Sequence, residues 1–145
     1  MTDAGRTVVV IPCSGIGKTA GSVSREAAYE LCDALRPDRT RLVALSKLVL
    51  GEEEARAAVR AVPSITIDGC KLRCAAKLVE LSGGTIAHEV SVLDVYKRNR
   101  TLKAEGIAAL DAAGLALARA AAEEAALAVD EATSGRTTGE DSDRG

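Results

Sequence analysis

Four runs of apolar and β-branched residues divide the first hundred residues of the chain. The runs at 7–11 and 64–68 are dense in β-branched residues, and those at 40–45 and 88–96 mix apolar with polar positions. Apolar runs without strict alternation are typical of strands covered on both faces, as in parallel sheets. We therefore predict four strands in one mostly parallel sheet.

Between these runs, apolar residues recur at helical spacing. Residues 22–35 carry an apolar stripe behind Ser22, a candidate N-cap; residues 52–61 begin with three acidic residues, which the helix dipole favours there; and residues 70–82 end at two glycines. Strands that alternate with helices predict an α/β fold. We expect a four-stranded, mostly parallel sheet flanked by helices in Rossmann-like or flavodoxin-like layers.

The last third of the chain is rich in alanine. Residues 102–132 predict one long helix, which either packs along the domain or pairs with a second copy in a homodimer. The composition of the residues after it is typical of a disordered tail. We divide the chain into an α/β domain at 1–100, a long helix at 101–132 and a tail at 133–145.

Composition narrows the classes of function. The chain has no Phe, no Trp and two Tyr among 145 residues, which argues against nucleic-acid binding through aromatic stacking. No run approaches the roughly 18 apolar residues of a membrane span, and the N-terminus lacks the apolar run of a signal peptide. We expect a cytoplasmic protein without membrane or nucleic-acid partners. In that compartment, its four cysteines are metal-binding, redox or core residues rather than disulfides.

Several chemically active residues follow the ends of the predicted strands. In parallel α/β sheets, ligands bind beyond the carboxyl ends of the strands, so these residues converge on one edge. They are Cys13 after the first strand, Ser46 and Lys47 after the second, and Asp68, Cys70 and Cys74 after the third.

The glycine-rich segment after Cys13 precedes a helix, where free amides and the helix dipole favour negative charge. We expect this position, with Lys18 and Arg25 nearby, to lower the pKa of the Cys13 thiol. The same segment is a candidate anion-binding loop; its residues are Ser14, Gly15, Gly17 and Lys18. It is not an ATP-binding P-loop, because Pro12 stands where the first glycine of that motif belongs.

The segment "DGCKLRC" adds two thiols. Four residues apart on a helix, Cys70 and Cys74 would share one face and could chelate a metal, with Asp68 as the helix cap. Cys74 also aligns with the apolar positions that follow it, which fits a core residue. We interpret Cys32 as a core cysteine, and His88 as lying at the opposite end of the sheet from these thiols.

Three stretches together resemble the DGC-domain family: "PCSGIGKTAGSVSREAAYEL", "LVLGEEEA" and "ITIDGCKLRCAAKLVELSGG". The resemblance covers roughly residues 8 to 100, and it implies zinc binding, which for the family is itself inferred from its cysteines. It implies Cys13, Cys70 and Cys74 as metal ligands, with Asp68 as a further candidate. Ala44 stands where the family pattern has another cysteine, so one ligand of a four-coordinate site is missing.

Three functions remain open from the sequence. The first is a cytoplasmic protein that binds zinc or another thiophilic metal through its thiolates. The second is a thiol redox or sulfur-transfer protein with Cys13 as the nucleophile and Cys70 or Cys74 resolving. The third is a non-catalytic module that binds an anion or a partner.

Overall fold

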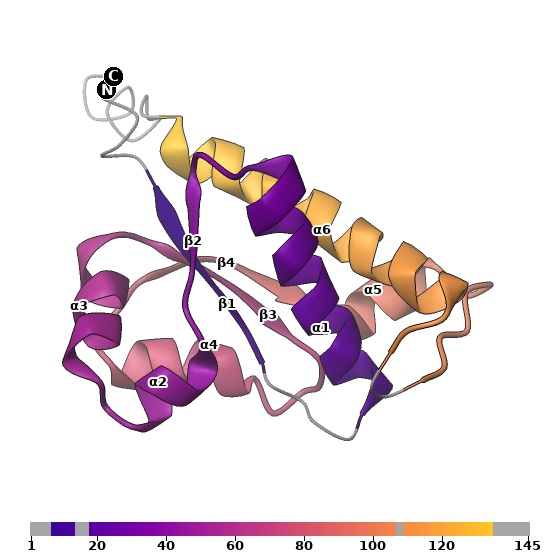
Figure 1. Cartoon of the computed structure of the whole chain (residues 1–145), viewed down its shortest axis with the longest axis horizontal. Helices are drawn as coiled ribbons and strands as arrows, with labels where there is room; N and C mark the ends of the chain where they lie inside the picture. Colours follow the sequence, from indigo (N-terminus) through magenta and orange to yellow (C-terminus); the bar gives the residue numbers. More distant parts are fainter. Residues whose placement is uncertain (1–6, 14–17, 107–108, 135–145) are drawn as a thin grey trace.

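The computed structural model describes residues 7–13, 18–106 and 109–134. Four strands form one sheet in the order β2-β1-β3-β4, and every neighbouring pair is parallel (Figure 1). The strands are β1 (Val8–Pro12), β2 (Thr40–Leu42), β3 (Ser64–Asp68) and β4 (Ile86–Ser91). The predicted parallel α/β sheet is confirmed.

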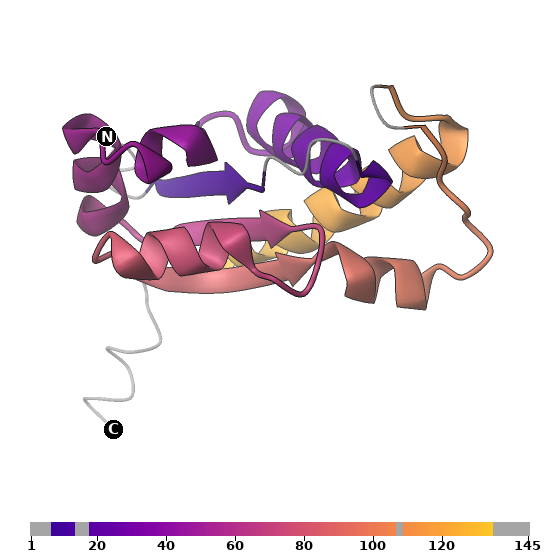
Figure 2. The same ribbon diagram turned by 90° about the horizontal axis from the view of Figure 1, so that it is seen from below.

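Helices cover both faces of the sheet (Figure 2). They are α1 (Thr19–Tyr29), its π-helical continuation η2 (Glu30–Leu35), α2 (Leu45–Val49), α3 (Glu53–Ala61), α4 (Cys74–Leu81), α5 (Val92–Arg98) and α6 (Ala112–Thr133). One core cluster joins the sheet to α1, α5 and α6, and a second joins it to α2, α3 and α4. Within the ranges described, none of these helices combines the length and hydrophobicity needed to cross a bilayer.

Small side chains let α1 and α6 lie side by side, as Figures 1 and 2 both show. Ala27 and Ala28 of α1 and Ala121 and Ala122 of α6 are fully buried in the same cluster. Alanine permits this close approach, so the core needs no large aromatic side chain. One face of α6 is thus covered by its own chain. The predicted division into domains remains a prediction, and so does the homodimer.

Several element boundaries differ from those predicted, and local capping explains two of them. The long helix begins at Ala112, ten residues later than expected, because the Asp111 carboxylate accepts the N–H of Gly114 at 2.9 Å. The run at 88–96 is a strand only to Ser91, whose hydroxyl accepts the N–H of Asp94 at 3.4 Å and caps α5.

The first helix also starts earlier than predicted. It begins at Thr19 with Lys18 as its N-cap, so Ser22 lies inside the helix and is buried there. Ser22 therefore accepts a hydrogen bond from Arg25 at 3.1 Å instead of capping the helix. Of the tail predicted at 133–145, Thr133 belongs instead to α6, and residues 135–145 fall outside the described residues.

Candidate functional site

The site is built around the Cys13 thiol at the carboxyl end of β1. The backbone N–H of Cys13 donates to Ile67 O at 2.9 Å, which extends the pairing of β1 with β3. Its Sγ accepts the N–H of Gly69 at 3.2 Å and lies 3.2 Å from the Ser24 hydroxyl of α1. With 7% of its surface exposed, Cys13 is held between a strand, a loop and a helix.

Gly69 makes this junction possible because only glycine fits there. A Cβ at this position would lie 2.8 Å from the carbonyl oxygen of Ala20 and 3.1 Å from the backbone nitrogen of Gly21. Both are backbone atoms of the first turn of α1, and displacing them would disrupt the helix. The absence of a side chain therefore lets the loop after β3 reach the sulfur of Cys13.

The environment of Cys13 favours a neutral thiol. Burial raises the pKa of Cys13 above its ordinary value, and the hydrogen bonds from Ser24 and Gly69 oppose this only in part. The Ser24 hydroxyl is also 2.7 Å from Gly21 O, so its proton can point to Gly21 beside the neutral thiol and can turn to the sulfur of Cys13 beside a thiolate. The prediction of a lowered pKa is wrong, because desolvation outweighs the favourable contacts.

Asp68, at the end of β3, caps α4. Its carboxylate accepts the N–H of Ala75 at 2.8 Å and of Ala76 at 3.2 Å, as the sequence predicted for a capping aspartate. Burial raises the pKa of Asp68, while these two amides lower it. The carboxylate is thus tied to the helix start, and its charge acts on Cys13 from that side.

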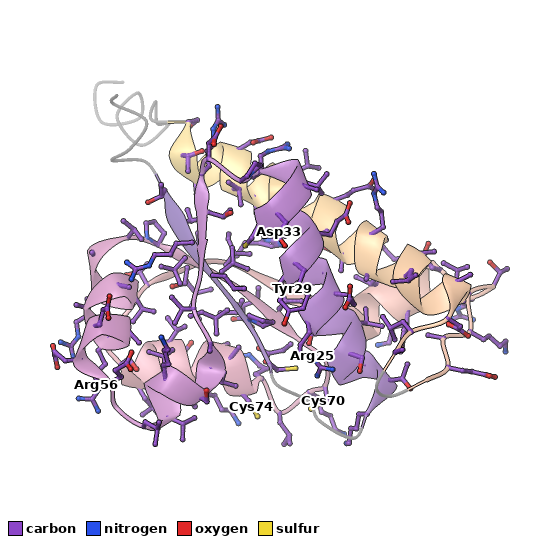
Figure 3. All side chains as sticks on the ribbon, viewed as in Figure 1. Arg25, Tyr29, Asp33, Arg56, Cys70 and Cys74 are labelled. Atoms are coloured by element: carbon purple, nitrogen blue, oxygen red, sulfur yellow. The ribbon has the colours of Figure 1, made fainter. Side chains whose placement is uncertain are left out.

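Cys70 and Cys74 do not share a helical face, contrary to the prediction. The helix begins at Cys74, and Cys70 lies in the turn before it, where the Arg73 N–H donates to Cys70 O at 3.3 Å (Figure 3). Arg73 adopts a left-handed conformation, φ 55°, which ends the turn. The turn therefore lies between the contact of Gly69 with α1 and the start of the helix.

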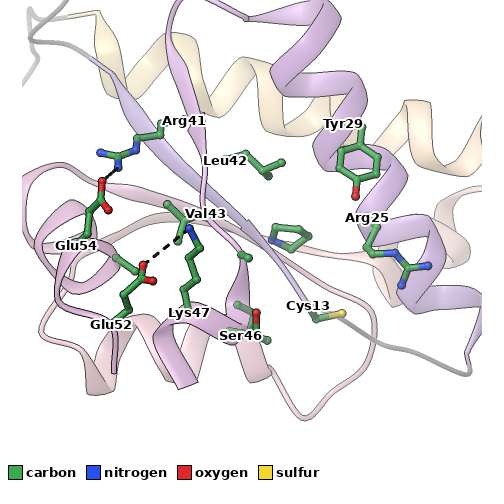
Figure 4. Close-up of a pocket in the computed structure, with 14 residues that line it drawn as sticks. Cys13, Arg25, Tyr29, Arg41, Leu42, Val43, Ser46, Lys47, Glu52 and Glu54 are labelled. Carbon is green, nitrogen blue, oxygen red and sulfur yellow. Dashed lines mark ion pairs between the residues drawn. The ribbon is translucent and has the colours of Figure 1, made fainter. Parts of the chain in front are cut away.

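A cavity of about 370 Å³ opens beside Cys13, between the ends of β1 and β2 and the helices α1, α2 and α3 (Figure 4). Its volume is within the range of roughly 300–1,000 Å³ typical of small-molecule sites. The lining is apolar in part, with charged groups around it. The residues are Pro12, Cys13, Arg25, Tyr29, Arg41, Leu42, Val43, Ala44, Leu45, Ser46, Lys47, Glu52, Glu54 and Ala55.

Cys13 lines the cavity and also contacts Gly69 of the Asp-Gly-Cys turn. The comparison with known protein families identifies the domain to which these residues belong. A family model described as the DGC domain matches residues 9–113. The chain belongs to the DGC-domain family. The matched region contains every cysteine of this DGC domain. Neither the search of curated proteins nor that of solved structures finds a match.

The thiols of this DGC domain do not form a ready metal centre. Within residues 7–13, 18–106 and 109–134, no three side chains of His, Cys, Asp or Glu come close enough to hold a metal ion. Cys13 Sγ is in contact with Ser24 and Gly69, both Asp68 oxygens accept helix amides, and Cys74 is exposed. As placed, these residues do not fit a closed zinc site.

Ala44, where the resemblance to the family predicts a further cysteine, lines the same cavity as Cys13. Ser46 and Lys47 line it too, so the prediction that they reach this edge of the sheet is confirmed. The position where the chain departs from the pattern is therefore part of the cavity wall.

Other predicted residues lie away from the cavity or outside the described part. Cys32 packs against the core beside α1, and burial raises the pKa of its thiol. His88 lies in β4 and contacts Glu124 of α6 at 2.8 Å. Of the candidate anion loop, Ser14, Gly15 and Gly17 fall outside the described residues, and Lys18 caps α1.

Two important residues were missed by sequence reasoning. Ser24 is fully buried although it is polar, and it lies at i, i+4 and i+7 with Ala28 and Leu31 on an apolar stripe that runs along α1 into η2. A buried hydroxyl needs a hydrogen-bond partner, so a serine on an apolar stripe is a pattern from which this contact could have been predicted. Tyr29 is one of two aromatic residues in the chain, and it lines the cavity.

Proposed function

We propose that this DGC domain is a thiol redox protein that binds a small molecule in the cavity and reacts with it through Cys13. The observation that carries the proposal is the position of Cys13. Cys13 lines a cavity of ligand size, and the Gly69 N–H and the Ser24 hydroxyl lie 3.2 Å from its sulfur. These contacts can hold the negative charge of a thiolate when the proton leaves.

The reaction we propose is thiol–disulfide exchange. The Cys13 thiolate attacks one sulfur of a small disulfide, a new S–S bond forms as the old one breaks, and the leaving thiolate takes a proton from water. Cys70 then attacks the Cys13 sulfur, which closes a Cys13–Cys70 disulfide and releases the second small thiol. Cys70 suits this role because it directly follows Gly69, whose N–H contacts the sulfur of Cys13.

The test is to treat the protein at pH 8 with hydroxyethyl disulfide and to map the products by mass spectrometry. We expect a Cys13–Cys70 disulfide in the unmodified protein and a trapped adduct on Cys13 in Cys70→Ser. Cys74→Ser is the matched control and should behave like the unmodified chain. An unmodified Cys13 in every variant, while the exposed Cys74 reacts, would overturn the proposal. A persulfide on Cys13 after treatment with thiosulfate, whose outer sulfur is transferred to the thiolate as sulfite leaves, would instead favour sulfur transfer.

Zinc binding stays a prediction that the resemblance to the family implies. A metal site would need Cys13, Cys70 and Cys74 to move together, since no such group exists among the described residues. Metal analysis of protein purified without a histidine tag separates the two ideas. Stoichiometric zinc that is lost in Cys70→Ser would favour a metal centre, and metal-free protein that forms the disulfide would favour exchange.

A further inference from the structure

The cavity beside Cys13 contains two large apolar side chains that the fold leaves partly uncovered. Leu42 is 40% exposed at the end of β2, an edge strand of the sheet, and Tyr29 is 44% exposed at the end of α1. Both line the cavity, and Figure 4 shows them next to each other above Cys13. Large apolar side chains exposed together in a concave site are typical of a surface that a ligand covers.

Much of the remaining wall is apolar as well. Pro12, Val43 and Leu45 line the cavity, together with the small side chains of Ala44 and Ala55. An apolar group that enters this space removes its own surface from water along with that of the wall. Each CH₂ group buried in this way favours binding by roughly fourfold. The cavity therefore suits a ligand whose affinity comes from an apolar substituent.

Four charged side chains of the lining are paired with one another. The Glu54 carboxylate lies 3.6 Å from the Arg41 guanidinium, and the Glu52 carboxylate lies 3.9 Å from the Lys47 ammonium group. Figure 4 shows both pairs on the side of the cavity away from Cys13. The protein itself compensates these four charges, so a ligand does not need charged groups to meet them.

We infer that the substrates of Cys13 are small disulfides with apolar substituents, and that Leu42 and Tyr29 bind the substituent. This inference rests on the proposed exchange reaction and names its substrate class. The Cys13 thiolate attacks one sulfur, and the new S–S bond keeps one apolar half in the cavity. The other half leaves as a thiolate that takes a proton from water. Attack by Cys70 then closes the Cys13–Cys70 disulfide and releases the retained half as a second apolar thiol.

The test compares three uncharged reagents: dipropyl disulfide, diethyl disulfide and hydroxyethyl disulfide. Dipropyl and hydroxyethyl disulfide are equal in length and differ only in the terminal group of each half, which is a methyl in one and a hydroxyl in the other. Diethyl disulfide lacks this terminal group. Since no reagent carries a charge, a difference between them does not arise from ion pairing with the lining.

The reactions are run on Cys70→Ser, in which the adduct on Cys13 stays trapped. The exposed Cys74 of the same molecules is the internal reference. Mass spectrometry gives the rate of adduct formation on each cysteine, and the ratio of the Cys13 rate to the Cys74 rate cancels the intrinsic reactivity of each reagent. We expect this ratio to be roughly tenfold higher for dipropyl than for hydroxyethyl disulfide, because burying the hydroxyl removes it from water. Diethyl disulfide should give an intermediate ratio.

Two further substitutions in the Cys70→Ser chain test the residues that bind the substituent. Leu42→Ala and Tyr29→Ala remove apolar surface from a strand and from a helix, and neither side chain belongs to the two core clusters. Each should lower the ratio for dipropyl disulfide several-fold, while the ratio for hydroxyethyl disulfide changes little. Leu81→Ala is the matched control, since it removes an exposed leucine of α4 that does not line the cavity, and it should change neither ratio.

The outcomes separate the two proposals. Equal ratios for dipropyl and hydroxyethyl disulfide, or a preference that survives both Leu42→Ala and Tyr29→Ala, would overturn the substrate class while the exchange reaction stands. A Cys13 that reacts with none of the three reagents, while Cys74 is modified, would overturn the exchange reaction itself, and the substrate class with it.

Discussion

The junction around Cys13 and the turn around Cys74 bring thiols to the same edge of the sheet, yet they are built differently. Cys13 is buried and its sulfur touches an amide and a hydroxyl, whereas Cys74 is exposed at the first position of α4. The junction depends on backbone packed against backbone at Gly69. The difference teaches that position at a ligand-binding edge does not decide the chemistry of a thiol; its nearest neighbours do.

The largest effect is expected where the junction is tightest. Gly69→Ala should lower the free energy of unfolding by about 1–3 kcal/mol, because its Cβ would meet the Ala20 carbonyl at 2.8 Å. The loop must then retreat, and the amide that contacts Cys13 moves with it. Urea denaturation measures the loss, and Lys71→Ala, at an exposed position of the same connection, is the control. Equal stability of the two variants would contradict the tight packing.

The pH dependence of stability tests the buried thiol itself. Since burial raises the pKa of Cys13, the unfolded chain ionises first as the pH rises, near the ordinary thiol value of about 8.5. The stability that the neutral thiol contributes is complete below that pH and is lost as the pH rises through the folded pKa. We expect the midpoint of urea denaturation to decrease as the pH is raised from about 8 to about 10.

Cysteine variants show which thiol causes this loss of stability at high pH. Cys13→Ala should make the fall shallower, and the remaining fall comes from Cys32, whose pKa burial also raises. Cys74→Ala should leave the pH profile as it is, because this thiol is exposed. A profile that depends on Cys74 and not on Cys13 would reverse the comparison between the two regions.

The next largest effect is expected from loss of the hydrogen bond between Ser24 and Cys13. Its hydroxyl lowers the pKa of Cys13, so Ser24→Ala should raise that pKa further and slow the exchange reaction a few-fold at pH 8, as expected for the loss of one hydrogen bond. Exchange rates measured across pH would show the profile shifted upward. Ser46→Ala, in the cavity wall and exposed, is the control; an equal slowing there would contradict a specific contact.

Much of the fold could be predicted because the patterns that determine it are local. The β-branched run at 64–68 matches β3 residue for residue, and the alternation of strands and helices predicts the parallel sheet. The edge at which Cys13, Ser46 and Asp68 gather follows from the direction of parallel strands. These features need only periodicity and strand order.

The details of the site could not be predicted, because they depend on contacts between distant segments. The approach of Gly69 to Ala20 joins residues 49 positions apart, and α4 starts only at Cys74, after the turn that follows Gly69. The pKa of Cys13 was predicted in the wrong direction, since a loop before a helix suggests stabilised charge while the depth of burial is not visible in the sequence. Sequence identified the thiols but not their surroundings.

The smallest effect is expected in the exposed turn. Arg73, which adopts the left-handed conformation, donates two hydrogen bonds to Glu89 at 2.8 and 2.7 Å, yet both side chains are about 40% exposed. Glu89→Gln should therefore lower the free energy of unfolding much less than Gly69→Ala and leave the exchange rate of Cys13 unchanged. A loss as large as that of Gly69→Ala would show that the turn, and not the junction, stabilises this edge of the sheet.

The same pair has a pH dependence opposite in sign to that of Cys13. Arg73 lowers the pKa of Glu89 below its ordinary value, so the pair contributes stability above the unfolded pKa of about 4.3, and this is lost as the pH falls through the folded pKa. Denaturation midpoints compared between pH 6 and pH 3 should fall less steeply in Glu89→Gln than in the unmodified chain. Glu54→Gln, which breaks a more exposed pair, is the control and should follow the unmodified profile. One region of the edge thus weakens as its thiol ionises, and the other as its carboxylate is neutralised.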